Sequence, residues 1–220
     1  MRVLAVDTTT PRGSAAVAGP QGILAEARVT TADGHSRWLL PAVSALLQGL
    51  GLDARDVDAF AVTIGPGSFT GLRVGLGSIQ GLAMAAGRPC VGLSTLDVLA
   101  AAAAGSAPTI VAVLDAFRGE VYSGVYDGEG RLRGDRRVGP LTRVLEGLPS
   151  GTAFVGEVDA PSREAIRSGV PGAVFPLTAV FLAGPLAVRA LRMAEAGETV
   201  PPSALRPLYL RSADIRAPRP

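Results

Sequence analysis

The chain has 220 residues, 48% of them hydrophobic, which is enough to bury a substantial core as one domain or as two small lobes. Its 21 basic residues are all arginines and face 19 acidic residues, so composition alone does not indicate strong nucleic-acid binding. One histidine and one cysteine, far apart in sequence, cannot supply the two or three such ligands that a zinc or iron site usually needs.

The sequence also favours a cytoplasmic location. The longest nearly uncharged apolar stretch, 74–87, is too short to span a bilayer. Asp7 interrupts the first apolar run after a few residues, so we expect no signal peptide. Cys90 has no second cysteine with which to form an internal disulfide, as is usual for proteins of a reducing compartment.

The first half of the chain predicts three antiparallel strands followed by alternating helices and strands. The first strand is apolar and ends in Asp7, and a polar turn through Thr8, Thr9 and Thr10 leads to the second. The predicted elements are strands at 3–6, 13–18 and 23–29, a helix at 36–50, a strand at 60–64, a helix at 69–86, a strand at 90–93 and a helix at 95–104. This order is the layout of a ribonuclease-H-like lobe.

The same pattern begins again after 105–108. A strand at 110–114 ends in Asp115 as the first strand ends in Asp7, so we expect the two aspartates at equivalent positions of two lobes. Further strands are predicted at 121–126, 131–138 and 153–156, with helices at 162–168 and 179–196, the last interrupted by Pro185. We therefore predict two domains, 1–104 and 105–220, with a Pro- and Arg-rich tail from 199 that wraps back over the body.

A glycine-rich junction, GPGSFTGLR at 65–73, connects the fourth strand to its helix. Gly-Pro-Gly requires a sharp turn, and Ser68 is placed to cap the helix. A helix start of this kind can hold an anion. However, the chain has no lysine for the phosphate loop of nucleotide hydrolases, and Thr70 replaces the third glycine of the dinucleotide fingerprint. A tight turn without a ligand is the simpler interpretation.

The helix after this junction carries glycines at a spacing of four residues, Gly71 with Gly75 and Gly77 with Gly81. Such spacing allows a neighbour to approach closely. The neighbours are either the sheet and another helix of this chain, or the sheet on one side and a partner protein on the other. We favour the partner protein, because the stretch at 36–50 adds an apolar and aromatic surface, although core packing is the ordinary role for a lone tryptophan. The candidate interface residues are His35, Trp38, Leu39, Leu72, Arg73, Gly75, Leu76 and Ile79.

Six segments together resemble the TsaB/YeaZ family. They are DTTTP, DGHSRWLLPAV, GPGSFTGLR with its helix, GLSTLDVLA, LDAFRGEVY and PLYLR, which extend from residue 3 to about residue 211. The resemblance implies an α/β, actin-like, two-lobed fold in which each lobe is ribonuclease-H-like, with a mixed sheet flanked by helices. It also implies a noncatalytic dimerisation subunit in the synthesis of threonylcarbamoyladenosine beside the tRNA anticodon, bound to the catalytic paralogue TsaD and to the ATPase TsaE.

Nucleotide binding is the main alternative function. Asp7 and the turn with Thr9 resemble the first phosphate motif of actin-like ATPases, with Asp115 as the expected counterpart, so these three residues are the candidates for binding a nucleotide. The second turn, DAFRGE, has one glycine where the kinases and chaperones have several, so we expect no tight ATP site and no resident cofactor. We also expect no catalytic residue and no metal site. An actin-like kinase or ATPase, and a glycoprotease-like metallopeptidase, are the competing hypotheses.

The resemblance leads to specific expectations about partners. The two N-terminal helices should pair with equivalent helices of TsaD, and the same apolar helices would allow a homodimer when TsaD is absent. Contact with tRNA should be indirect or weak, for example through Arg206, Arg211, Arg216 and Arg219 of the tail. On this basis, Trp38→Ala or Gly75→Leu should weaken the complex and leave the isolated protein folded.

Overall fold

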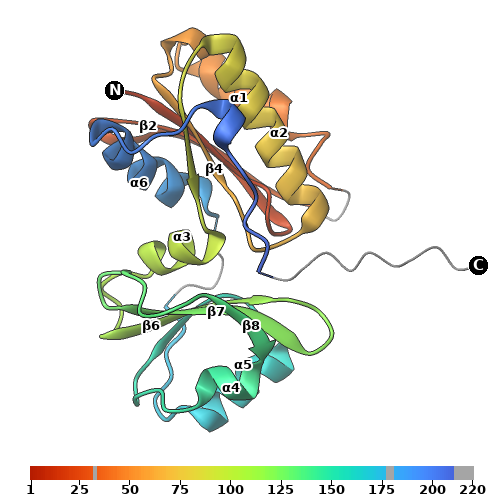
Figure 1. Ribbon diagram of the computed structural model, residues 1–220, viewed down its shortest axis with the longest axis vertical. Coiled ribbons are helices and arrows are strands. Elements are labelled where there is room, and N and C mark those ends of the chain that lie inside the picture. The colour runs from red at the N-terminus through yellow and green to blue at the C-terminus, as the bar shows by residue number, and fades with distance from the viewer. Residues whose placement is uncertain (32–33, 177–180, 211–220) are drawn as a thin grey trace, which may run out of the picture.

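The computed structural model describes residues 1–31, 34–176 and 181–210, and these form two lobes (Figure 1). The first lobe is built on a five-stranded sheet of order β3-β2-β1-β4-β5. Strands β1, β2 and β3 form an antiparallel meander, whereas β1, β4 and β5 run parallel. The strands are β1 (Val3–Asp7), β2 (Arg12–Gly19), β3 (Gly22–Thr30), β4 (Ala59–Thr63) and β5 (Cys90–Leu93). This is the order expected of a ribonuclease-H-like lobe.

Different helices cover the two faces of this sheet, because successive residues of a strand point to opposite faces. In β1, Val6 lies in the core cluster beneath α1 (Leu39–Gly49) and α2 (Phe69–Ala86). Its neighbour Ala5 lies in the cluster that includes α6 (Ala183–Glu195) on the other face. Figure 1 shows α1 and α2 on one side of the sheet and α6 on the other. The first lobe is therefore a three-layer sandwich of helices, sheet and helix.

The second lobe repeats this arrangement around a four-stranded sheet of order β8-β7-β6-β9. Strands β6, β7 and β8 are antiparallel and β6 is parallel to β9. Its elements are β6 (Thr109–Asp115), β7 (Glu120–Asp127), β8 (Arg137–Pro140), α4 (Leu141–Leu145), β9 (Ala153–Glu157) and α5 (Ala160–Gly169). Helices α4 and α5 cover one face, and α3 (Thr95–Ala102) lies between the lobes (Figure 1). Two short 3₁₀ helices, Ala54–Asp56 and Pro202–Ala204, complete the described structure.

A partly buried polar contact fixes α3 to the second sheet. The Tyr126 hydroxyl donates a hydrogen bond of 2.8 Å to Asp97 Oδ1. The Arg136 guanidinium donates to both carboxylate oxygens of Asp97, at 2.9 and 2.5 Å. Burial, together with the neighbouring Asp97 carboxylate, raises the pKa of Tyr126. Because α3 also shares a core cluster with strands of the first lobe, this contact connects the two lobes.

The predicted element order is confirmed, with local differences. The first helix begins at Leu39, three residues after the predicted Ser36. Strand β8 is limited to Arg137–Pro140, whereas the prediction was 131–138. The reason is Gly134, whose φ of 79° breaks the extended conformation before β8 begins. The short helix α4 was missed because five residues do not establish a helical period.

Pro185 does not interrupt the last helix. It is the third residue of α6, in the first turn, where the backbone N–H has no helical acceptor and proline is tolerated. The predicted start of this helix, at 179, lies outside the described residues.

The described part of the tail packs back onto the first lobe, as predicted. Val200 and Cys90 exchange backbone hydrogen bonds of 2.8 Å, and the Leu208 N–H donates to the Ile64 carbonyl at 2.7 Å. Since α6 also covers the first sheet, the chain from 183 to 210 returns to the lobe in which it started. The domain boundary at 104/105, between α3 and β6, stays a prediction. Arg211, Arg216 and Arg219 of the predicted basic tail lie outside the described residues.

Substitutions in the Asp97 contact should reveal how strongly α3 is held. Tyr126→Phe removes one hydrogen bond and leaves Arg136 paired, so we expect the free energy of unfolding to fall by about 1 kcal/mol. Asp97→Ala deprives both partners of their acceptor and should cost about 2 to 3 kcal/mol. Urea unfolding provides the measurement. Arg131→Ala, in an exposed ion pair with Asp127, is the control and should produce no measurable change. Equal losses for Tyr126→Phe and Asp97→Ala would contradict this account.

Candidate functional site

The adjacent ends of β1 and β4 bring several polar side chains together in the first lobe. Asp7 Oδ1 accepts hydrogen bonds from the hydroxyls of Thr9 and Thr63, both at 2.6 Å, and from the Thr9 N–H at 3.2 Å. The Thr95 hydroxyl, at the start of α3, lies 3.4 Å from that of Thr9. We refer to Asp7, Thr9, Thr63 and Thr95 as the Asp7 cluster. Asp7 is fully buried, and its Oδ2 has no hydrogen-bond partner in the described part of the chain. Burial raises the pKa of this carboxyl group, although the hydrogen bonds oppose the shift.

His35 connects the Asp7 cluster to the start of α1. Its Nδ1 accepts a hydrogen bond of 3.0 Å from the Trp38 indole N–H, and the two rings meet edge to face with centroids 5.7 Å apart. His35 also forms a hydrogen bond with the backbone of Thr10. Burial lowers the pKa of His35, against the influence of the nearby Asp7. An imidazole held by hydrogen bonds within the chain acts as a packing residue.

The turn after β1 presses against the start of α2, where glycines make room for it. A Cβ atom at Gly71 would lie 1.9 Å from the Thr8 carbonyl oxygen, and one at Gly75 would lie 2.4 Å from Thr8 Oγ1. The Thr8 hydroxyl donates to the Gly71 carbonyl at 2.7 Å. This first glycine pair is therefore required by packing within the chain.

The GPG junction is enclosed by other segments of the same chain. Ser68 caps α2 as predicted, with Oγ accepting from the Gly71 N–H at 3.2 Å. The Gly65 carbonyl accepts from the Thr95 N–H at 2.8 Å, and a Cβ at Gly65 would lie 2.8 Å from the Leu208 carbonyl oxygen. These contacts account for the glycines and support the tight turn without a ligand.

The equivalent turn of the second lobe has a different environment. Asp115 ends β6, as Asp7 ends β1, but it is exposed, and its Oδ1 accepts from the Phe117 N–H at 2.8 Å. Phe117 and Arg118 have φ angles of 61° and 59°, in the left-handed region that favours glycine. The Phe117 side chain is 69% exposed. The candidate nucleotide residues thus lie at equivalent strand ends, but only Asp7 is enclosed by hydroxyl groups.

An ion pair between the lobes lies next to these turns. Arg12, at the start of β2, pairs with Glu157, at the end of β9. Both side chains are about one-third exposed, at 32% and 30%. The pair connects the lobes on the side where the two strand-end turns lie.

Most residues of the predicted partner interface lie inside the folded chain. Six of its eight residues are buried within the chain, namely His35, Leu39, Leu72, Gly75, Leu76 and Ile79. The leucines and Ile79 form the stripe of α1 and α2 that packs on the sheet, so the chain itself covers them. Trp38 is half-buried, and Arg73 is exposed.

The outward side of α2 carries the second glycine pair. A Cβ atom at Gly77 or Gly81 would meet nothing within 4 Å, in contrast to the first pair. One turn earlier, Arg73 lies over the Phe69 ring, with Cζ 3.9 Å from the centroid. The Phe69 ring lies 5.9 Å from that of Tyr209 in the tail. We define the outer face as Phe69, Arg73, Gly77, Gly81, Met84 and Tyr209.

Sequence reasoning missed Phe69, Met84 and Tyr209. A signal was available for the helix positions, because Phe69, Arg73, Gly77 and Gly81 follow one another at intervals of four. The four-residue spacing shows which residues lie on the same side of α2, but it does not show which side of the helix faces the sheet. Tyr209 joins this group only through the return of the tail.

Comparisons with known proteins place this geometry in a family. A family model described as "TsaD: tRNA N6-adenosine threonylcarbamoyltransferase" matches residues 21–149. The solved structure of YeaZ from Pseudomonas aeruginosa is similar with a TM-score of 0.83 and 32% identity, over 95% of this chain and 99% of that one. The chain belongs to the TsaB/YeaZ family. TsaB of Escherichia coli, a tRNA threonylcarbamoyladenosine biosynthesis protein, is 37% identical over 139 residues, which cover 59% of this chain and 60% of the E. coli protein.

TsaB/YeaZ membership confirms the actin-like, two-lobed fold predicted from the sequence. A more distant structure, the activator of 2-hydroxyisocaproyl-CoA dehydratase from Clostridium difficile with bound ADPNP, has a TM-score of 0.51 and 10% identity, which shows likeness of fold alone. Among the described residues, no group of three or more His, Cys, Asp or Glu side chains could hold a metal ion. In the same part of the chain, no helix has the length and apolar character needed to cross a membrane.

The two glycine pairs of α2 should respond in opposite ways to a methyl group. Gly71→Ala forces a Cβ against the Thr8 carbonyl and should lower the free energy of unfolding by about 3 kcal/mol. Gly81→Ala adds a methyl group in open space and improves helix propensity, so it should raise the free energy of unfolding by up to about 1 kcal/mol. Chemical denaturation of both variants measures this difference. Similar effects of the two substitutions would show that the assignment of inner and outer sides is wrong.

The buried carboxyl group predicts a pH dependence. Because the pKa of Asp7 is raised on folding, its contribution to stability is complete below its ordinary pKa of 3.8 and is lost as the pH rises through the folded value. Asp7→Asn cannot ionise. We therefore expect this variant to gain stability relative to the unmodified chain as the pH rises above about 4 in urea titrations. If the difference in free energy of unfolding between Asp7→Asn and the unmodified chain stays constant with pH, or changes in the opposite direction, a raised pKa of Asp7 is ruled out.

Proposed function

We propose that the chain is a noncatalytic subunit in the synthesis of threonylcarbamoyladenosine in tRNA, and that it binds the catalytic paralogue TsaD through the outer face of α2. Family membership and the name of the E. coli relative support the pathway. The outer face supports the mode of action. An association with TsaE is part of the same proposal, without assigned contact residues.

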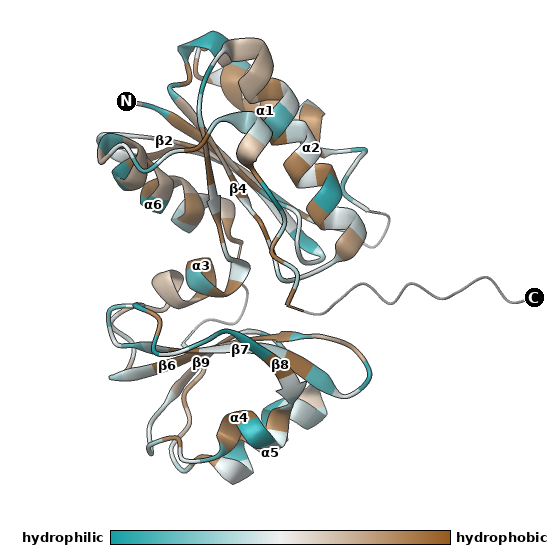
Figure 2. Cartoon of the chain, viewed as in Figure 1, coloured by the Kyte–Doolittle hydropathy of each residue, from teal (hydrophilic) through white to brown (hydrophobic). Residues whose placement is uncertain are grey.

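The outer face is the observation that carries this proposal. Gly77 and Gly81 weaken an isolated helix by up to about 1 kcal/mol each, and no neighbour within the described chain uses the space they leave. Small residues at this spacing let a second helix approach closely. Met84 is 68% exposed and Phe69 is 46% exposed. Figure 2 shows apolar residues recurring along α2. An aromatic residue stacked with an arginine is typical of the residues that dominate binding energy at interfaces.

The geometry of the docking follows from the shared fold. A paralogue with the same lobe presents an equivalent helix, so the two helices can pack about an approximate twofold axis. Contact through α2 would also hold the turn after β1 in place, because Thr8 packs directly beneath that helix. We infer that this chain supports a productive arrangement of the catalytic subunit. In the absence of TsaD, the same face would serve a homodimer.

The Asp7 cluster supports a noncatalytic role. Asp7 Oδ1 is saturated by hydroxyl and amide donors, and the cluster is closed off by the GPG junction and α3. In the second lobe, the turn after β6 contains Phe117 and Arg118 in place of a glycine-rich loop. These features leave little room for a nucleotide in the isolated chain.

A kinase or ATPase remains the second candidate because of one atom. Asp7 Oδ2 is buried without a hydrogen-bond partner among the described residues. In a nucleotide-binding protein, such an oxygen would be satisfied by a hydrated cation or by water. Binding of ATP to the isolated chain that is lost in Asp7→Asn would favour this candidate.

Assembly with TsaD from the same organism tests the outer face. Gly77→Leu fills the open side of α2 and should weaken the complex at least about tenfold, a loss of about 1.4 kcal/mol, without lowering the melting temperature of the isolated chain. Arg73→Ala should also weaken the complex with TsaD. Light scattering after size exclusion, across a concentration series, measures the affinity. Gly75→Leu, considered above, is unsuitable, because its Cβ would lie 2.4 Å from Thr8 Oγ1 and disturb the isolated fold.

The matched control is Ala165→Leu, which introduces the same side chain at an exposed position of α5 in the other lobe. It should assemble normally. Unchanged assembly of Gly77→Leu, or equal weakening by Ala165→Leu, would refute the outer face as the docking surface.

A further inference from the structure

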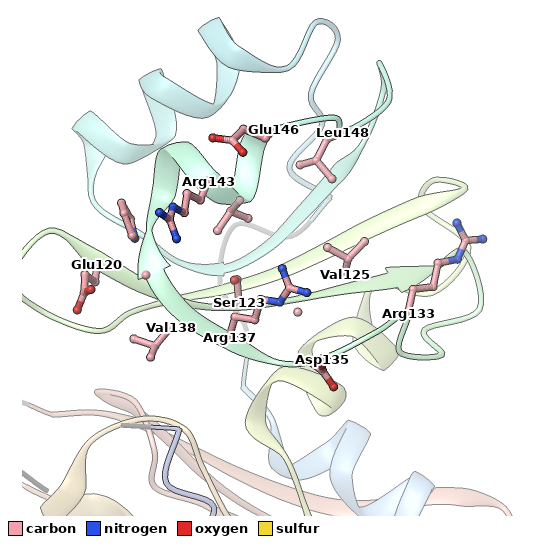
Figure 3. Close-up of a pocket in the computed structure, with 14 residues that line it drawn as sticks. Glu120, Ser123, Val125, Arg133, Asp135, Arg137, Val138, Arg143, Glu146 and Leu148 are labelled. Carbon is pink, nitrogen blue, oxygen red and sulfur yellow. The ribbon is translucent and has the colours of Figure 1, made fainter. Parts of the chain in front are cut away.

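The second lobe contains a hollow that the proposed function does not use. It lies between α4 and the side of β7 and β8 that faces this helix, and has a volume of about 450 Å³ (Figure 3). This volume is in the range of small-molecule sites. Val125, Val144 and Leu148 form an apolar part of its lining. The hollow exists because α4, with five residues, is too short to cover the sheet as far as its β8 edge.

Two arginines extend into this hollow. Arg137 of β8 and Arg143 of α4 direct their guanidinium groups into the space between helix and strand (Figure 3). Within the described chain, neither forms an ion pair. Their neighbours behave differently, since Arg131 pairs with Asp127 and Glu129, and Arg136 pairs with Asp97 on the other side of the sheet. The arginines at the hollow are thus the ones left available for an external anion.

The Ser123 hydroxyl group adds a third donor. Ser123 of β7 lines the hollow, is only 5% exposed and makes no side-chain hydrogen bond to the residues that the structure describes. Its hydroxyl borders the space of the hollow, where it can donate a hydrogen bond to a ligand or to water. Guanidinium groups are donors only, and their planar fork matches the geometry of a phosphate. The three groups together suit an oxyanion.

Carboxylates at the edge limit the strength of this site. Glu120, Asp135 and Glu146 balance Arg133, Arg137 and Arg143, so the lining carries no net charge. Figure 3 shows Glu120 and Asp135 at the margins, pointing away from the hollow. The long-range electrostatic attraction of an anion to the hollow is therefore small, and recognition of the anion depends on direct hydrogen bonds. Such a site is suited to one contact within a larger assembly.

We propose that this hollow binds a backbone phosphate of RNA, with Arg137, Arg143 and Ser123 as donors and the attached nucleoside against the apolar lining. RNA is favoured over an isolated phosphate compound because Arg133, also in the lining, extends the line of arginines toward one end of the hollow, where the next phosphate of a chain would lie (Figure 3). The choice of RNA rests on the proposed function, in which tRNA is the molecule modified.

The test uses the full chain and a fluorescein-labelled RNA hairpin with the sequence of a tRNA anticodon stem-loop. Fluorescence anisotropy should show that Arg137→Gln and Arg143→Gln each weaken binding, and that together they weaken it at least about tenfold. The double variant should also reduce the slope of log affinity against log salt by about 0.7 to 0.9, because the contact with one phosphate is lost. Glu146→Gln should strengthen binding. Arg131→Gln, in which the lost arginine is already paired, is the matched control and should bind normally.

Unchanged RNA affinity of the double variant, equal loss in Arg131→Gln, or no RNA binding by the unmodified chain would overturn the proposal. Binding of AMP that depends on both arginines, without RNA binding, would overturn the choice of RNA. Circular dichroism of each variant excludes unfolding as the cause of a loss of RNA binding. Assembly with TsaD is measured in parallel. Loss of RNA binding with normal assembly supports both proposals, whereas arginine-dependent RNA binding by a chain that never assembles supports the hollow and refutes the docking function.

Discussion

The contact between the turn after β1 and the start of α2 determines the arrangement of the first lobe. Atoms of Thr8 and Thr9 occupy the space that side chains at Gly67, Gly71 and Gly75 would need. A Cβ atom at any of these three positions would lie only 1.9 to 2.4 Å from the nearest threonine atom. Gly71 and Gly75 lie within α2 and cost helix stability, and this cost is offset by burial of β1 and by the hydrogen bond from the Thr8 hydroxyl to the Gly71 carbonyl. The contact fixes which side of α2 faces the sheet, and therefore which side is left for a partner.

Much of the fold could be predicted from the sequence, because alternation and helical periods report local geometry directly. The sequence could not show which side of α2 is open, since the two glycine pairs have the same spacing and differ only in what lies opposite them: Thr8 at Gly75, and open space at Gly81. The hollow of the second lobe could also not be predicted from the sequence. Arg137 and Arg143 are two of many arginines in the sequence, and their position depends on where β8 begins, which Gly134 shifts from the predicted residue.

The two lobes share an architecture but have diverged at their equivalent sites. In the first lobe, Asp7 is enclosed and its turn is packed beneath α2, whereas in the second lobe Asp115 is exposed beside a left-handed turn. The second lobe instead has its hollow beside α4, on a sheet with one strand fewer. We infer that the chain keeps the actin-like framework as a platform for binding, with a protein surface on one lobe and a phosphate site on the other.

The central claim is that the outer face of α2 becomes covered when the chain meets TsaD. Cys90 is buried, and burial raises the pKa of its thiol to about 11, so a thiol introduced by Gly81→Cys would be the reactive one in this chain. Its alkylation rate, followed by mass spectrometry with and without TsaD, tests the claim directly, with Ala165→Cys as the reference position. The account predicts that TsaD strongly slows alkylation at position 81 and leaves the rate at 165 unchanged. Equal rates at position 81 in the free chain and in a complex verified by light scattering would contradict it.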